Sequence, residues 1–109
     1  MKRYLGSVQI YSGRPNPVWK MTVETGITLE SIWELLEPYT GEYLKHTRLG
    51  YSGCKLLVEN EFEYLAFNGV VARSQSGKVE LRTDRNRSFE KMIFDTAPPG
   101  IIPDDFSGF

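Results

Sequence analysis

The sequence predicts an α+β fold in which a mainly antiparallel sheet of five or six strands packs against two helices. Three observations predict it: short β-favouring runs recur between turn signals, two stretches carry apolar residues at helical spacing, and Asn68-Gly69, a dipeptide typical of a tight hairpin, separates two β-favouring runs. Because the chain has only 109 residues, we expect one compact domain over residues 1–97 and an extended tail over residues 98–109.

The N-terminal region is expected to form two strands. The first spans Arg3–Tyr11 and ends at Ser12-Gly13. In the second, Trp19, Met21 and Val23 alternate with polar residues, which is the period of a half-buried strand. We expect these two strands to pair as a wide hairpin.

The first helix is expected to run from Leu29 to about Pro38, with Thr28 as its N-cap. Glutamates are expected on the solvated side of this helix. The apolar face consists of Leu29, Ile32, Trp33, Leu36 and Tyr39, and the opposite side carries Glu30, Glu34 and Glu37.

The C-terminal half is expected to contain four further strands and one helix. Ser88 is the expected N-cap of this helix, with Glu90 in its first turn, and Pro98-Pro99-Gly100 ends it. The residues between Gly41 and Gly53 are expected to be irregular. The strands are Cys54–Val58, Phe62–Phe67, Val70–Arg73 and, after a turn at Ser76-Gly77, Lys78–Arg82, and the helix carries Phe89, Met92, Ile93 and Ala97.

Composition excludes several classes of function. Thirteen Lys and Arg against 14 Asp and Glu give a net charge of -1, so the chain lacks the basic surplus typical of proteins that bind nucleic acid or anionic lipid. A small basic patch at Arg82, Arg85, Arg87 and Lys91 is interpreted as a solvated helix entry. No apolar run approaches the length of a membrane span or a signal peptide. A single cysteine, Cys54, cannot form an intrachain disulfide, so we expect a cytoplasmic protein.

Few residues of the sequence are candidates for catalysis or for metal binding. His46 is the only histidine and Cys54 the only cysteine, so zinc ligation by paired residues is excluded and no cofactor is expected. A catalytic Cys54–His46 pair has no support from spacing, because a thiol opening an apolar strand usually packs as a small hydrophobe. Glu59, Glu61 and Glu63 alternate, and we interpret them as a solvated strand face rather than a carboxylate metal site.

The most informative segment is the loop Arg14-Pro15-Asn16-Pro17. The prolines remove backbone donors and rotational freedom, whereas Arg14 and Asn16 keep strong hydrogen-bonding side chains. A guanidinium held rigidly favours two-point recognition of a carboxylate or phosphate. The competing interpretation is structural: Arg14 pairs with an internal carboxylate, and Trp19 covers the core beneath the loop.

These residues also carry a resemblance. Ser12-Gly13-Arg14-Pro15-Asn16-Pro17 with Trp19, followed by Leu49-Gly50-Tyr51, Asn68-Gly69-Val70-Val71, Phe89-Glu90 and Thr96-Ala97, resembles a group of small microbial proteins that share an S-G-R-P-N-P-x-W element. The resemblance implies no particular activity, substrate or cofactor. It singles out the loop of Arg14 as the segment to follow.

Three functional hypotheses stay open. The favoured one is a non-catalytic binding or accessory module that presents Arg14 and Asn16, supported by Trp19, to a protein partner or an anionic small molecule. The second is a small enzyme or ligand-binding protein with an anion pocket built from Arg14, Asn16, His46 and Arg48. The third is a toxin-neutralising partner, suggested by small size and an acidic helix.

The tail from Pro98 to Phe109 is expected to dock rather than fray. It carries Ile101, Ile102, Phe106 and Phe109, which are too apolar for a segment exposed only to solvent. Phe106 or Phe109 is the expected anchor. The groove that receives it lies either on the same chain or on another copy or partner, in which case the tail would join a homo-oligomer.

Overall fold

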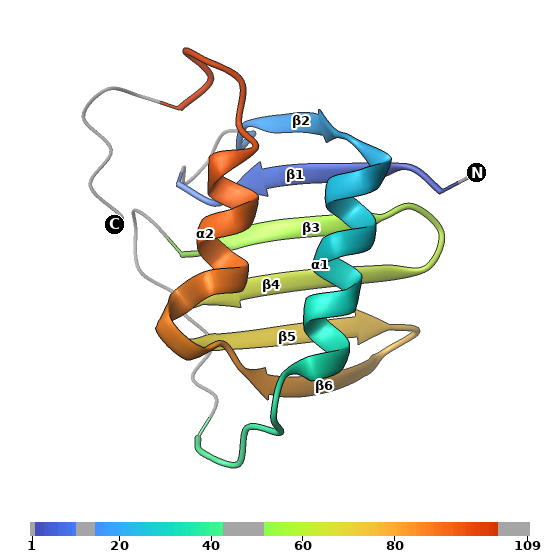
Figure 1. Cartoon of the computed structure of the whole chain (residues 1–109), viewed down its shortest axis with the longest axis vertical. Coiled ribbons are helices and arrows are strands. Elements are labelled where there is room, and N and C mark those ends of the chain that lie inside the picture. Colours follow the sequence, from blue (N-terminus) through green and yellow to red (C-terminus); the bar gives the residue numbers. More distant parts are fainter. Residues whose placement is uncertain (1, 11–14, 43–51, 103–109) are drawn as a thin grey trace.

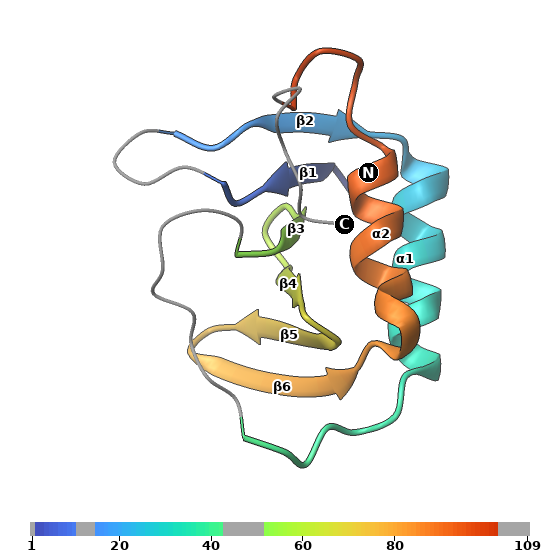
Figure 2. The same ribbon diagram turned by 90° about the vertical axis from the view of Figure 1, so that its left-hand side faces the viewer.

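The protein is a two-layer structure of one sheet and two helices, seen in a computed structural model that describes residues 2–10, 15–42 and 52–102 (Figure 1). The six strands are all antiparallel to their neighbours, in the order β2-β1-β3-β4-β5-β6. Both helices cross the same face of the sheet (Figure 2), which confirms the predicted α+β fold. The elements are β1 (Tyr4–Val8), β2 (Val18–Met21), α1 (Val23–Leu35), β3 (Cys54–Val58), β4 (Phe62–Phe67), β5 (Val70–Gln75), β6 (Lys78–Thr83), a 3₁₀ turn (Arg85–Arg87) and α2 (Ser88–Asp95).

The hairpins of the sheet follow the predicted turns. Asn68 and Gly69 both adopt positive φ angles, 50° and 90°, as a type I′ turn requires. Ser76 and Gly77 repeat this geometry between β5 and β6, with φ angles of 50° and 83°. The right-handed twist of such turns matches that of the strands, so β4, β5 and β6 form a continuous meander.

The start of α1 differs from the sequence prediction. The helix begins at Val23, six residues before Leu29, and its N-cap is Thr22 rather than Thr28. The Thr22 hydroxyl accepts a hydrogen bond from the Thr25 N–H at 3.2 Å. Val23, predicted to be in a strand, is therefore the first helical residue, and Thr28 lies inside the helix.

A residue of β6, Arg82, stabilises the C-terminal end of α1. The helix ends at Leu35 rather than at about Pro38, because Leu36 already adopts extended backbone with a ψ angle of 144°, so Tyr39 lies outside the helix. Arg82 donates from Nη1 to the Trp33 carbonyl at 2.6 Å, supplying a cation at a helix end whose last turn has none. The chain then bridges from Pro38 to Arg82 at the edge of β6.

The cap of α2 also differs from the prediction. Ser88 is the first helical residue and is exposed, whereas the buried carboxylate of Asp84 accepts the N–H groups of Phe89 at 2.8 Å and Glu90 at 3.0 Å. Burial raises the pKa of Asp84, against the lowering effect of these two N–H groups. The Asp84 side chain can reach the first turn of α2 because two residues of the intervening 3₁₀ turn adopt left-handed φ angles, Asn86 at 59° and Arg87 at 56°.

A second buried carboxylate ties α2 to the sheet. Glu90 is fully buried, accepts the Asn68 N–H at 3.2 Å, and pairs with Arg87 through two bonds of 2.8 and 3.1 Å. A buried carboxylate is tolerated when its oxygens are paired and hydrogen-bonded. Glu90 thus holds the β4–β5 turn against the first turn of α2.

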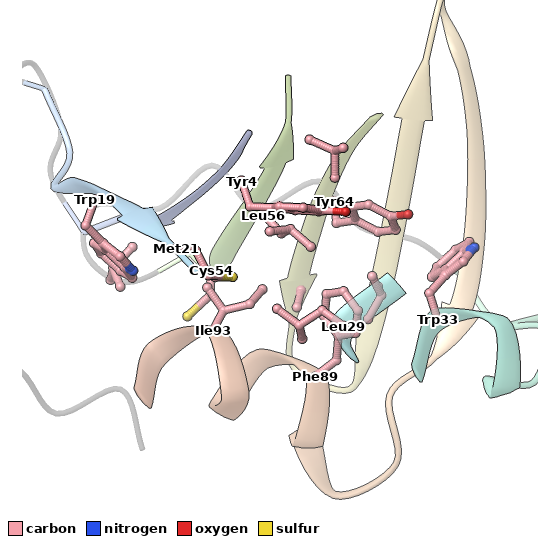
Figure 3. Close-up of a cluster of buried hydrophobic side chains, with 14 residues drawn as sticks. Tyr4, Trp19, Met21, Leu29, Trp33, Cys54, Leu56, Tyr64, Phe89 and Ile93 are labelled. Carbon is pink, nitrogen blue, oxygen red and sulfur yellow. The ribbon is translucent and has the colours of Figure 1, made fainter. Parts of the chain in front are cut away.

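The core lies between the helices and the sheet (Figure 3). Two half-buried residues of the expected tail, Ile101 and Ile102, pack against it, whereas Phe106 and Phe109 lie outside the described residues. Within the described residues no helix is long and apolar enough to cross a membrane. The buried core side chains include Tyr4, Val8, Trp19, Met21, Leu29, Trp33, Cys54, Leu56, Val58, Tyr64, Ala66, Val71, Phe89 and Ile93.

Replacement of Asp84 should test which residue caps α2. Asp84→Ala leaves two buried N–H groups without an acceptor and should lower the free energy of unfolding by about 2–4 kcal/mol. Ser88→Ala should lower it by less than about 0.5 kcal/mol, because its side chain is exposed. Urea unfolding measures both. An equal loss in the two variants would contradict the assignment of the cap to Asp84.

Candidate functional site

The loop highlighted by the sequence is braced by Asn16. Its side-chain oxygen accepts the Ile10 N–H at 2.7 Å, and its side-chain N–H donates to Gln9 Oε1 at 3.3 Å. Ser7 adds a bond from Oγ to the Pro17 carbonyl at 2.7 Å. The amide of Asn16 therefore extends the β1–β2 pairing beyond the strands. Both bonds join parts of the same chain.

Trp19 likewise has an internal role. Its side chain is 5% exposed and covers Gly6 on β1, where a Cβ atom would come within 2.6 Å of the indole nitrogen. The indole N–H donates to the Thr96 hydroxyl at 2.8 Å. Trp19 thus packs β2 against the end of α2. This position agrees with the structural interpretation of the loop, in which Trp19 covers the core.

Three further predicted site residues, Arg14, His46 and Arg48, lie outside the described residues. The anion pocket proposed from Arg14, Asn16, His46 and Arg48 is therefore represented only by Asn16. Cys54, the thiol of the disfavoured catalytic pair, is fully buried in the core.

The acidic residues after β3 do not share one strand face. Asn60 has a φ angle of 66° in the turn between β3 and β4, so Glu59 and Glu61 flank a turn and only Glu63 lies in a strand. Each carboxylate pairs with a different cation, at 3.2 to 3.3 Å. In the described part of the chain, no three His, Cys, Asp or Glu side chains are grouped to hold a metal ion. The partners are Arg3 for Glu59, Lys2 for Glu61 and Lys55 for Glu63.

The basic patch before α2 is largely neutralised. Arg82 pairs with Glu80 at 2.7 Å, and Arg87 is bonded to the buried Glu90. Arg82 also lies over the ring of Trp33, with its guanidinium carbon 4.4 Å from the ring centre. Arg82 and Arg87 are thus held by contacts within the fold rather than solvated, whereas Arg85 and Lys91 are exposed, as predicted for a solvated helix entry.

A hollow of about 410 Å³ lies beside α1, next to the start of β1. Tyr4 closes its base and donates from its hydroxyl to Glu30. Val23 and Ile27 form an apolar wall and are 39% and 53% exposed. The lining residues are Lys2, Tyr4, Val23, Ile27, Glu30, Ser31 and Glu34.

The rim of this hollow is more acidic than basic. Lys2 Nζ lies 3.5 Å from Glu30 and 3.3 Å from Glu61. Glu34 is 69% exposed, and Arg73 approaches its carboxylate only to 4.0 Å. Burial, and then the hydrogen bond and charge of Glu30, raise the pKa of Tyr4. Its hydroxyl therefore stays protonated and remains a donor to Glu30.

Sequence reasoning missed this hollow because it placed the start of α1 too late. With the helix starting at Val23, the spacing of Val23, Ile27, Ser31 and Glu34 puts them on one side of it. The contribution of Tyr4 from β1 requires the tertiary fold.

Comparison with known proteins finds no matching family model, no matching curated protein and no matching solved structure.

Removal of the Asn16 side chain should destabilise the fold. Asn16→Ala leaves the Ile10 N–H without its acceptor and should lower the free energy of unfolding by about 1–2 kcal/mol. Lys20→Ala, at an exposed position of the adjoining strand, is the control and should change it by less than about 0.5 kcal/mol. Thermal and urea unfolding measure both, and an unchanged Asn16→Ala variant would contradict the bracing role.

Tyr4 should make stability depend on alkaline pH. Because its pKa is higher in the folded than in the unfolded chain, its contribution is complete below about pH 10 and is lost as pH rises towards the folded value. Tyr4→Phe should therefore reduce the decline of the free energy of unfolding between about pH 9 and 11. Tyr39→Phe is the matched control, because it removes a hydroxyl whose hydrogen bond, to the Glu42 carbonyl, is exposed. Equal slopes for Tyr4→Phe and wild type would refute this expectation.

Proposed function

We propose that the protein is a non-catalytic binding module whose loop around Arg14 contacts a protein partner or an anionic small molecule. The observation that supports this proposal is the bracing of the loop ends by Asn16 and by the Ser7–Pro17 bond. Pro15 and Pro17 stiffen the same segment. A contact segment whose two ends are fixed loses less conformational entropy on binding.

The bracing divides the roles within the S-G-R-P-N-P-x-W element. Asn16 and Trp19 maintain the hairpin and its packing, so the presented group is proposed to be Arg14 alone. Its guanidinium suits two-point recognition of a carboxylate or phosphate. We propose a cytoplasmic location, because the single cysteine of the sequence cannot form an intrachain disulfide.

Two other functions receive less support. An anion pocket built from Arg14, Asn16, His46 and Arg48 would have to share the Asn16 amide, which is already bonded to Ile10 and Gln9. A toxin-neutralising role rests on the acidic exposed side of α1, and such a side is common on solvated helices.

Arg14→Ala tests the proposal by separating binding from stability. Affinity capture from an extract of the source organism should retain a protein or anionic ligand on the wild type and lose it on Arg14→Ala. The proposal gives Arg14 a role in binding and none in the fold, so the melting temperature should stay within about 3 °C.

Lys20→Ala is the matched control, because it removes one positive charge from the adjoining strand. It should retain the same ligand as the wild type. A large fall in the melting temperature of Arg14→Ala with unaltered capture would show that Arg14 serves the fold, and the proposal would be wrong.

A further inference from the structure

We propose that the hollow beside α1 binds an alkylammonium group together with its aliphatic stem, carried either by a free amine or by a lysine side chain. The hollow lies at the start of β1, whereas the braced loop follows the other end of that strand. The inference is therefore independent of the role proposed for Arg14.

The charge of the rim selects a cation. Glu30 and Glu34 lie one helical turn apart on α1, and like charges at this spacing repel each other. No Lys or Arg occurs between Glu24 and Glu42, so the helix itself supplies no compensating charge. An ammonium group between the two carboxylates would relieve the repulsion, whereas an anion would add to it.

Lys2 shows how such a group is held at this rim. Its ammonium lies 3.5 Å from Glu30 and 3.3 Å from Glu61, so one carboxylate of the hollow already accepts a primary ammonium. Glu34 is the more accessible carboxylate, since it is 69% exposed and its approach to Arg73 is 4.0 Å. A ligand ammonium would bind Glu34 and compete with Lys2 for Glu30.

The apolar wall of the hollow predicts that the ligand carries an aliphatic stem. Val23 and Ile27 are 39% and 53% exposed beside the acidic rim, and Tyr4 closes the base. A chain of several methylene groups would cover these side chains and remove their apolar surface from water. Charge and wall together predict that a bare ammonium ion binds less well than an alkylammonium ion.

The test is a titration of the full-length protein with hexylammonium chloride at constant ionic strength, followed by amide chemical shifts. We expect saturable shifts at residues 23–34 with a dissociation constant on the order of 1 mM. Ammonium chloride lacks the stem and sodium hexanoate carries the opposite charge, so both should give weaker effects. Absence of localised saturable shifts, or equal binding of hexanoate, would overturn the proposal.

Three variants assign the binding to the hollow. Glu34→Gln should weaken hexylammonium about two- to fivefold, as expected for loss of one partly exposed ion pair. Lys2→Ala should strengthen it by a similar factor, because the competing ammonium is removed. Glu37→Gln removes the same charge from the segment after α1, outside the hollow, and should leave the affinity unchanged. Weaker binding by Lys2→Ala, or equal losses at Glu34 and Glu37, would refute the site.

The two sources of the group are separated by their probes. Tighter binding of pentylammonium than of an end-blocked lysine, both of which carry one positive charge, would identify a free amine as the ligand. The reverse order would identify a lysine side chain of a partner. Because Arg14→Ala leaves the hollow intact, its effect on capture and the hexylammonium titration test the two proposals separately.

Discussion

The contact between Gly26 of α1 and the ring of Tyr4 on β1 sets the distance between helix and sheet. A Cβ atom at Gly26 would lie 2.2 Å from Tyr4 Cγ, so any side chain there would push the helix outwards. Glycine inside a helix costs about 1 kcal/mol relative to alanine, and here the close packing offsets it. The same closeness lets the Tyr4 hydroxyl reach Glu30 one turn further along, so the hollow beside α1 depends on this glycine.

Strands and tight turns could be predicted because their signals are local. The bounds of β3 and β4 match the sequence prediction, and Asn68-Gly69 forms the expected turn. The helix starts could not be predicted, since each depends on distant or unusual geometry. Period-2 alternation continues through Val23, and the packing that makes Gly26 favourable in a helix comes from β1. Asp84 caps α2 only because two intervening residues adopt left-handed backbone.

For the candidate sites, too, local features could be predicted from the sequence and features that depend on distant residues could not. The sequence identifies the loop of Arg14 by its two prolines, but whether Asn16 faces a ligand or the protein depends on the pairing of β1 with β2, after which the Ile10 N–H lies within hydrogen-bond distance of the Asn16 side chain. The buried Glu90 is equally unreadable, because its partners come from the β4–β5 turn and from Arg87 in a left-handed conformation. Local composition shows which groups are available, and tertiary pairing decides which of them are already used.

The bridge from Pro38 to Arg82 has a consequence for self-association. Exposed strand edges are templates for adding strands from other molecules, which is how sheets grow into aggregates. At β6 the Thr83 N–H and the Leu81 carbonyl are bonded to the segment that follows α1, so the chain itself covers the last three residues of this edge. The opposite edge, β2, spans only four residues and carries an exposed lysine, Lys20, with Pro17 just before it. Both features of β2 discourage intermolecular strand addition, so each edge of the sheet carries a feature that opposes open-ended growth.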